Sequence, residues 1–178
     1  MVKKRGPPAW IFVIWFPLIT AFTAYWLYHI WTVQNKVPHY IWNNKDPLYL
    51  AITCSAVSTV FIFLQVQTVA TQRLFTKAGD TIYGEESDFL KLSKNVLQNT
   101  LEQSFLFIIN LLAAAVNGLP NERIVLVTMT FILARILFWC GYVVGVYIKF
   151  FPLRGPGFLL TFSNNVLLLL FNVLAFIR

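Results

Sequence analysis

Five long hydrophobic segments, each separated from the next by a short polar stretch, make up most of the chain. They cover residues 9–31, 48–75, 89–117, 122–149 and 158–177. A helix needs about 20 apolar residues to cross the hydrocarbon core of a bilayer, and every segment reaches that length. The pattern therefore predicts an all-α integral membrane helical bundle with five transmembrane helices.

The composition agrees with a membrane location. Charged residues make up 12% of the chain and hydrophobic residues 58%, whereas soluble domains carry about 25% charged residues. The net charge is +7, but the basic residues flank the hydrophobic segments. This placement favours contact with lipid head groups and argues against nucleic-acid binding. The two Cys and two His residues lack the spacing of metal ligands, so no metal site is predicted.

The first segment differs from the other four. It is rich in aromatic residues, too long for a cleaved signal peptide, and not followed by a small-residue cleavage site, which indicates a retained signal anchor. Residues 1–46 are therefore predicted to form an N-terminal signal-anchor helix and loop, and residues 47–178 a four-helix membrane domain. Pro47 suits the first position of the second helix, and Ser87 or Asp88 can cap the third.

The distribution of basic residues predicts the orientation. Most of the 14 Lys and Arg residues lie on the side of the bundle that holds the N-terminus. The positive-inside rule then places the N-terminus, the loop at 76–88 and the turn at 152–157 in the cytoplasm.

The third segment carries a polar stripe in an apolar helix. Asn95, Asn99 and Glu102 are spaced i, i+4 and i+7, so they share one helix face. A carboxylate inside a membrane span needs a partner or a cavity. Arg135 on the fourth segment lies about as far after the intervening turn as Glu102 lies before it, which predicts a Glu102–Arg135 ion pair. The alternative is that each faces water or another subunit.

The same matching of depth predicts a cleft. Asn99, Asn95 and Tyr142 would line it from the buried pair toward the cytoplasmic mouth. Basic residues would surround that mouth: Arg73, Lys91, Lys94 and Arg154. Such a cleft suits a small anionic ligand with amide groups, and its apolar neighbours suit a lipophilic second substrate that arrives from the membrane.

Three short motifs resemble the MAPEG family, the membrane-associated proteins in eicosanoid and glutathione metabolism. Asn99 and Glu102, with a Phe five residues later, resemble its second-helix motif. Arg135 and Tyr142 resemble its third-helix motif, and Arg154 followed by Gly-Pro-Gly-Phe resembles the turn before its last helix. The resemblance covers roughly residues 48–177, and the strings ARILFWCGYVVG and RGPGFLLTF are most similar to the five-span mattrin branch.

The resemblance implies a homotrimer in an endomembrane such as the endoplasmic reticulum, with glutathione bound between subunits near the cytosolic face. It implies that Asn99, Glu102, Arg135 and Tyr142 hold glutathione and that Arg154 helps to activate its thiol. Asn95 joins the ligand-binding set as a predicted residue of the cleft.

The chain departs from the family pattern at three positions. Asn95 and Leu97 stand where members typically have Arg and His, and Phe138 stands where a His is common. These departures favour a binding or scaffold protein that is catalytically silent. Its cleft would hold glutathione or a lipid-like ligand, and its first helix would pack against a membrane-protein partner. The alternative is a glutathione-dependent transferase or peroxidase that acts on a lipophilic electrophile. A channel or transporter is a weaker third interpretation.

Overall fold

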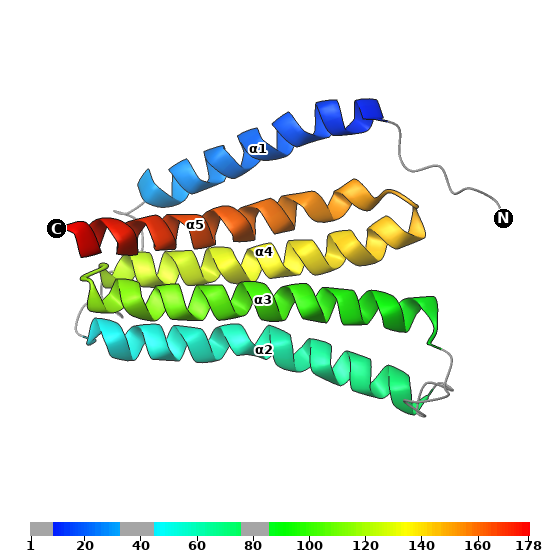
Figure 1. The fold of residues 1–178 in the computed structure, drawn as a ribbon, viewed down its shortest axis with the longest axis horizontal. Helices are drawn as coiled ribbons and strands as arrows, with labels where there is room; N and C mark the ends of the chain where they lie inside the picture. The colour runs from blue at the N-terminus through cyan, green and yellow to red at the C-terminus, as the bar shows by residue number, and fades with distance from the viewer. Residues whose placement is uncertain (1–8, 33–44, 76–85) are drawn as a thin grey trace.

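The computed structural model describes residues 9–32, 45–75 and 86–178, and it is all-α there (Figure 1). Its elements are α1 (Ala9–Thr32), α2 (Pro47–Leu74), α3 (Asp88–Val116), α4 (Asn121–Tyr147), the 3-10 helix η3 (Phe151–Arg154) and α5 (Gly155–Ile177). Among the described residues, four helices, α2 to α5, are long and apolar enough to cross a membrane. The predicted helices and the all-α class are thereby confirmed, while a fifth span stays a prediction. The two predicted polar loops lie largely outside the described residues.

Local sequence explains where the helices begin and end. The Asp46 carboxylate accepts a hydrogen bond from the Tyr49 backbone N–H at 3.1 Å, and Pro47 occupies the first turn of α2. The Ser87 hydroxyl caps α3 by accepting from the Leu90 N–H at 3.2 Å, as the sequence predicts. Gly118 ends α3 with a φ of 83°, a conformation that favours glycine.

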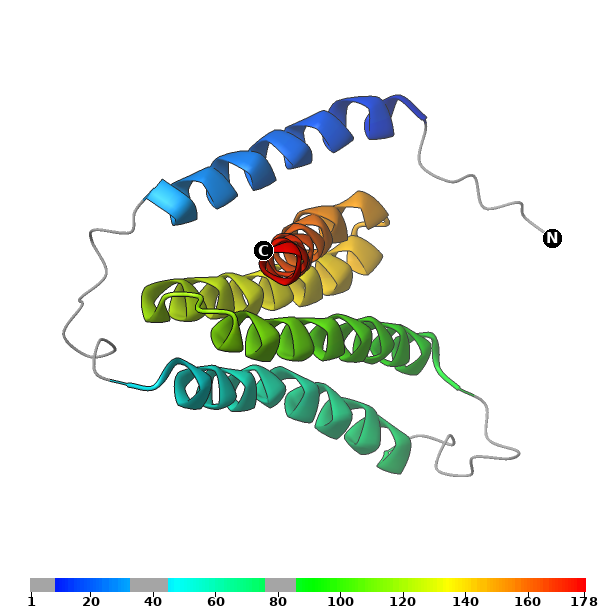
Figure 2. The ribbon, with the colours of Figure 1, turned by 60° about the vertical axis from the view of Figure 1, so that its left-hand side comes forward.

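The core of the bundle lies among α2, α3, α4 and α5. Figures 1 and 2 show α1 and α2 on opposite sides of the bundle, and α1 packs on α5. The apolar core occupies the half nearest the α3–α4 turn, where the Phe107 and Phe131 rings stack with centroids 4.2 Å apart. Leu111 and Leu168 are buried beside these two rings.

Two glycines bring α4, η3 and α5 unusually close. A Cβ on Gly157 would lie 2.2 Å from the Phe138 backbone nitrogen, and one on Gly141 would lie 2.3 Å from the Leu153 carbonyl oxygen. The segment that follows α4 therefore folds back along the last turns of that helix before α5 begins. As a consequence, α5 starts at the level of Phe138, and Arg154 is brought over the Tyr142 ring of α4.

Candidate functional site: a polar cleft between α3, α4 and α5

A cleft of about 450 Å³ opens between α3, α4 and the start of α5. Four of the residues that the sequence predicts for the site line this cleft together: Asn95, Asn99, Tyr142 and Arg154. The remaining lining residues are Phe138, Gly155 and Phe158. The cleft wall therefore combines polar and aromatic side chains, as small-molecule sites commonly do.

Arg135 lies beneath the cleft and does not line it. Its side chain is fully buried (0% exposed). The guanidinium donates to the Thr161 hydroxyl from Nε at 3.1 Å and from Nη2 at 2.6 Å, and to Asn99 Oδ1 from Nη1 at 3.0 Å. The Phe138 ring lies 4.7 Å from the guanidinium carbon. A single cation thus ties α4 to both α3 and α5.

The contact with Arg135 fixes the orientation of the Asn99 amide. Arginine only donates hydrogen bonds, so the amide oxygen of Asn99 must face it. The amide nitrogen of Asn99 then has no partner among the described residues. Because Asn99 lines the cleft, its two free N–H groups are available to an acceptor on a ligand.

Arg154 lies over Tyr142 at the same cleft. The guanidinium carbon is 5.1 Å from the centroid of the Tyr142 ring, within the range of a cation–π interaction. Arg154 is exposed and stands at the junction of η3 and α5. Among the described residues, Arg154 is the only basic residue that lines the cleft, and its guanidinium packs on the Tyr142 ring.

The predicted Glu102–Arg135 ion pair is wrong for the isolated chain. Glu102 is exposed, and its carboxylate accepts a hydrogen bond from Gln98 Nε2 at 2.8 Å. Glu102 faces outward from α3, while the neighbouring Thr100 and Gln103 face the core. Elsewhere on the molecule, Lys94 Nζ forms an ion pair with the Glu86 carboxylate at 2.7 Å.

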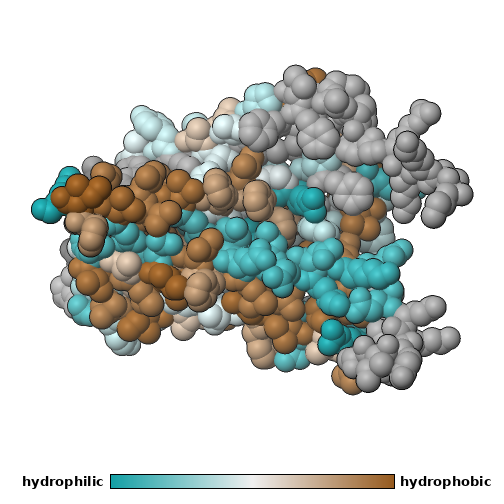
Figure 3. Space-filling view, in the orientation of Figure 1, coloured by the Kyte–Doolittle hydropathy of each residue, from teal (hydrophilic) through white to brown (hydrophobic). Residues whose placement is uncertain are grey.

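The outward face of α3 carries an exposed polar row. Asn95, Gln98 and Glu102 are spaced i, i+3 and i+7 and are all exposed, and Figure 3 shows hydrophilic residues gathered over the right-hand half of α3. Polar groups within a span normally face a cavity or another helix, because lipid offers them no hydrogen-bond partner. The row is therefore an exposed polar surface on a helix that is apolar enough to cross a membrane.

The three departures from the family motifs have distinct surroundings. Asn95 lines the cleft, Leu97 packs with Val69 and Leu90 between α2 and α3, and Phe138 is buried over Arg135. None of these side chains supplies a base or a cation. Arg154 is accordingly left as the cleft-lining cation among the described residues.

Thr161 is a residue of this region that the sequence does not single out. Thr161 accepts two of the three hydrogen bonds from Arg135 and donates to the Gly157 carbonyl at 2.8 Å. Counting from the turn at 152–157 does not pair it with Arg135, because η3 folds back along α4. The close approach at Gly157 is the sequence signal, since a Gly in an apolar helix often permits tight packing.

The comparison with protein families agrees with the motifs. The model of the MAPEG family matches residues 50–174, which is more than two thirds of the 178 residues. No curated protein and no solved structure matches the chain. The closer likeness to the mattrin branch stays a prediction.

Proposed function

The chain belongs to the MAPEG family, and from this premise we propose that its polar cleft binds glutathione or a lipid-like ligand without turning it over. The protein would act as a binding or scaffold protein of the membrane. The observation that carries this proposal is the cleft itself, in which Asn99, Tyr142 and Arg154 converge. The multi-pass helical bundle suits a site of this kind, since ligands often bind between the helices of a bundle.

The donors of the cleft fit the chemistry of glutathione. Glutathione carries two carboxylates and two peptide carbonyls, all of which accept hydrogen bonds. Arg154 supplies a planar set of N–H donors suited to a carboxylate, and Asn99 supplies amide N–H groups whose direction is set by Arg135. Tyr142 and Asn95 can each donate as well. The described residues that line the cleft include no carboxylate, so nothing there repels the carboxylates of a ligand.

The scarcity of cations supports a silent protein. A thiol becomes a thiolate at neutral pH when a positive charge lies near the sulfur. Asn95, Leu97 and Phe138 supply none, and Arg135 is fully buried and hydrogen-bonded to Asn99 and Thr161. Ligand binding without chemistry is the function that this set of side chains favours.

The exposed row on α3 supports a homotrimer. In an assembly with α3 at the subunit boundary, Asn95, Gln98 and Glu102 would meet polar groups of a neighbouring subunit and leave lipid. Glu102 would then join a ligand site across the boundary, which is the role that the family motif implies for it. We further propose that the N-terminus lies on the cytoplasmic side and that α1 is a fifth span, which can contact a membrane-protein partner. The protein would reside in an endomembrane such as the endoplasmic reticulum.

One observation favours the alternative, a glutathione-dependent transferase or peroxidase that acts on a lipophilic electrophile. Arg154 lines the cleft and is held against Tyr142, so it is the candidate catalytic residue for thiolate stabilisation. Bound glutathione would supply the thiol. Phe138 and Phe158 would face the apolar co-substrate from the membrane side. Turnover of a model electrophile that is lost in Arg154→Gln would establish this alternative.

Calorimetry of glutathione binding to the purified protein tests both versions. Arg154→Gln should weaken binding at least tenfold, because a hydrogen bond to a charged group contributes about 1.5–3 kcal/mol. Lys149→Gln is the matched control: it removes the same charge from an exposed residue at the same end of the bundle that does not line the cleft. Absence of binding to the unaltered protein would refute the glutathione site.

A further inference from the structure

A small crevice lies between α2, α3 and α4, and the described residues that line it are distinct from those of the polar cleft. Its volume is about 30 Å³. A single water molecule needs about 10–15 Å³ of such room, so the crevice holds one water or about two at most. Its wall is mostly apolar, and its lining residues are Gln65, Thr68, Phe89, Leu92, Ser93, Val96, Trp139 and Val143.

Gln65 brings an unpaired polar atom to this crevice. Its side chain is 7% exposed, and its amide Oε1 is buried with no hydrogen-bond partner among the described residues. A buried acceptor without a partner is costly, and folded proteins usually supply one from the chain or from an ordered water. Surrounding lipid cannot supply it.

Two hydroxyl groups of the crevice have hydrogen-bonding capacity to spare. Ser93 Oγ accepts from Gln72 Nε2 at 2.9 Å, which leaves its own O–H to donate. The Thr68 hydroxyl donates to the Leu64 carbonyl at 2.8 Å, which leaves its oxygen to accept. A water in the crevice would donate to Gln65 Oε1 and Thr68 Oγ1 and accept from Ser93, and buried waters typically make about three hydrogen bonds.

We propose that the crevice binds an ordered water molecule that joins α2 to α3. The volume excludes a ligand the size of glutathione or a lipid, and an apolar occupant would leave Gln65 Oε1 unpaired. Leu92 and Val96 line the crevice and also pack against Phe138 of the polar cleft. The water would therefore hold α2 against the part of α3 that supports the cleft wall.

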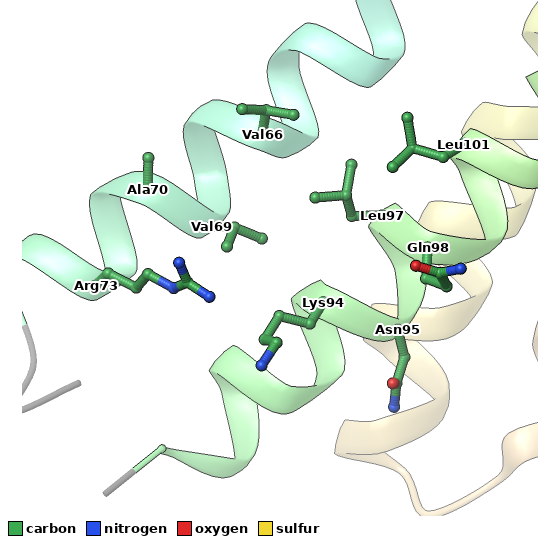
Figure 4. A pocket seen from close by; sticks show the side chains of 9 residues that line it. All are labelled: Val66, Val69, Ala70, Arg73, Lys94, Asn95, Leu97, Gln98 and Leu101. Carbon is green, nitrogen blue, oxygen red and sulfur yellow. The ribbon is translucent and has the colours of Figure 1, made fainter. Parts of the chain in front are cut away.

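The larger groove between α2 and α3 is a different surface (Figure 4). Figure 4 shows Arg73 of α2 and Lys94 of α3 in that groove, together with Asn95 and Gln98 of the exposed row. In the proposed homotrimer a neighbouring subunit would cover this row. The crevice contains none of these four residues, so the water site does not depend on how the subunits assemble.

The sign of the stability change in Gln65→Met tests the proposal. Met keeps the length and the helix propensity of Gln but removes the amide. If a water satisfies the amide, its loss should raise the unfolding equilibrium constant by about threefold or more. Gln103→Met gives the reference for a satisfied amide, because Gln103 Oε1 accepts from Asn165 Nδ2 at 3.0 Å. An unchanged or lower constant in Gln65→Met would contradict the proposal, since removing an unpaired buried acceptor stabilises a fold.

Solid-state NMR of the full-length protein in bilayers tests the water directly. Magnetisation should pass from water to the Gln65 amide protons, whose signal is identified by its loss in Gln65→Met. Val143→Phe fills the crevice from its wall and should slow this transfer by about threefold or more. The matched control is Val144→Phe, which adds the same ring at an exposed residue that does not line the crevice and should leave the transfer unchanged. No transfer in the unaltered protein, or equal transfer in the two Phe variants, would overturn the proposal.

Discussion

The two halves of the α3–α4–α5 bundle are held together by different chemistry. At the middle of α4, Arg135 joins the three helices through Asn99 and Thr161, and the polar cleft opens from there toward the α4–α5 turn. Near the α3–α4 turn, stacked Phe107 and Phe131 fill an apolar core. The first half contains a cation without a carboxylate partner among the described residues, whereas the second is a closed hydrocarbon interior.

Three Asn side chains are joined by hydrogen bonds at the end of the second half, near the α3–α4 turn. Asn172 on α5 accepts from Asn117 Nδ2 at 3.1 Å and donates to the Asn110 carbonyl oxygen at 2.9 Å. These neutral groups satisfy one another between α3 and α5, so they can fix the register without demanding a ligand. The comparison teaches that polar residues serve both halves, but only the half built on Arg135 leaves N–H donors free in a cleft.

The largest expected effect comes from Gly157→Ala. The new Cβ would lie 2.2 Å from the Phe138 nitrogen and 2.7 Å from the Ala134 carbonyl oxygen, so α4 and α5 must move apart. Because these contacts are backbone atoms that cannot rotate away, we expect a loss of about 3 kcal/mol or more in the free energy of unfolding. Reversible unfolding in mixed micelles measures it, and glutathione binding should weaken with it.

Gly118→Ala is the control for this change at the opposite end of the bundle. A Cβ there meets nothing within 4 Å, and only the positive φ of 83° opposes it. That conformation costs an L-residue about 1–2 kcal/mol. Equal losses for the two variants would show that packing against Phe138 does not hold the cleft half together.

Thr161→Val should have the next largest effect. It keeps the shape of the side chain but removes the acceptor of two hydrogen bonds from the buried Arg135. A buried donor left without a partner costs about 1–3 kcal/mol, and more when it is charged, so we expect a loss of about 2–4 kcal/mol. The same unfolding measurement applies, and a shifted Arg135 should also weaken binding at Asn99.

Thr100→Val tests whether that loss is specific. Thr100 is as deeply buried as Thr161, but its hydroxyl donates only to the Val96 carbonyl of its own helix at 2.9 Å. We expect a change below about 1 kcal/mol, because such a bond adds little to helix stability. A Thr161→Val loss no larger than this would contradict the central role of Arg135.

Hydropathy and local capping signals were sufficient to predict the helices. The ends of α2, α3 and α4 fall within one or two residues of the predicted segments, and Ser87 caps α3 as predicted. Depth matching across the α3–α4 turn also indicated that Asn95, Asn99 and Tyr142 lie near one another, and they line one cleft. These features depend on distance along the chain, which a sequence displays directly.

The direction in which a side chain faces around its helix axis cannot be obtained from distance along the chain. Spacing along the sequence matches Glu102 with Arg135 in depth, yet Arg135 meets Asn99, one helical turn before Glu102 on α3, because Glu102 faces outward. Thr161 escaped prediction for a different reason: the fold-back of η3 at Gly141 shifts α5 along α4. Both differences arise from packing between helices, whose register depends on contacts between backbone atoms.

The smallest expected effect belongs to the amide-closed half. Asn172→Ala removes the hydrogen bonds that join it to Asn117 and Asn110. Interhelical hydrogen bonds in membranes average about 0.6 kcal/mol and reach about 1.7, so we expect a loss of about 1 kcal/mol and no change in glutathione binding. The stability loss of Asn117→Ala should add to that of mutations near Arg135, but it should not add fully to that of Asn172→Ala. A double-mutant cycle therefore measures the interaction between Asn117 and Asn172. Weaker glutathione binding in Asn172→Ala would mean that the two halves are coupled and that the amide-closed half also shapes the cleft.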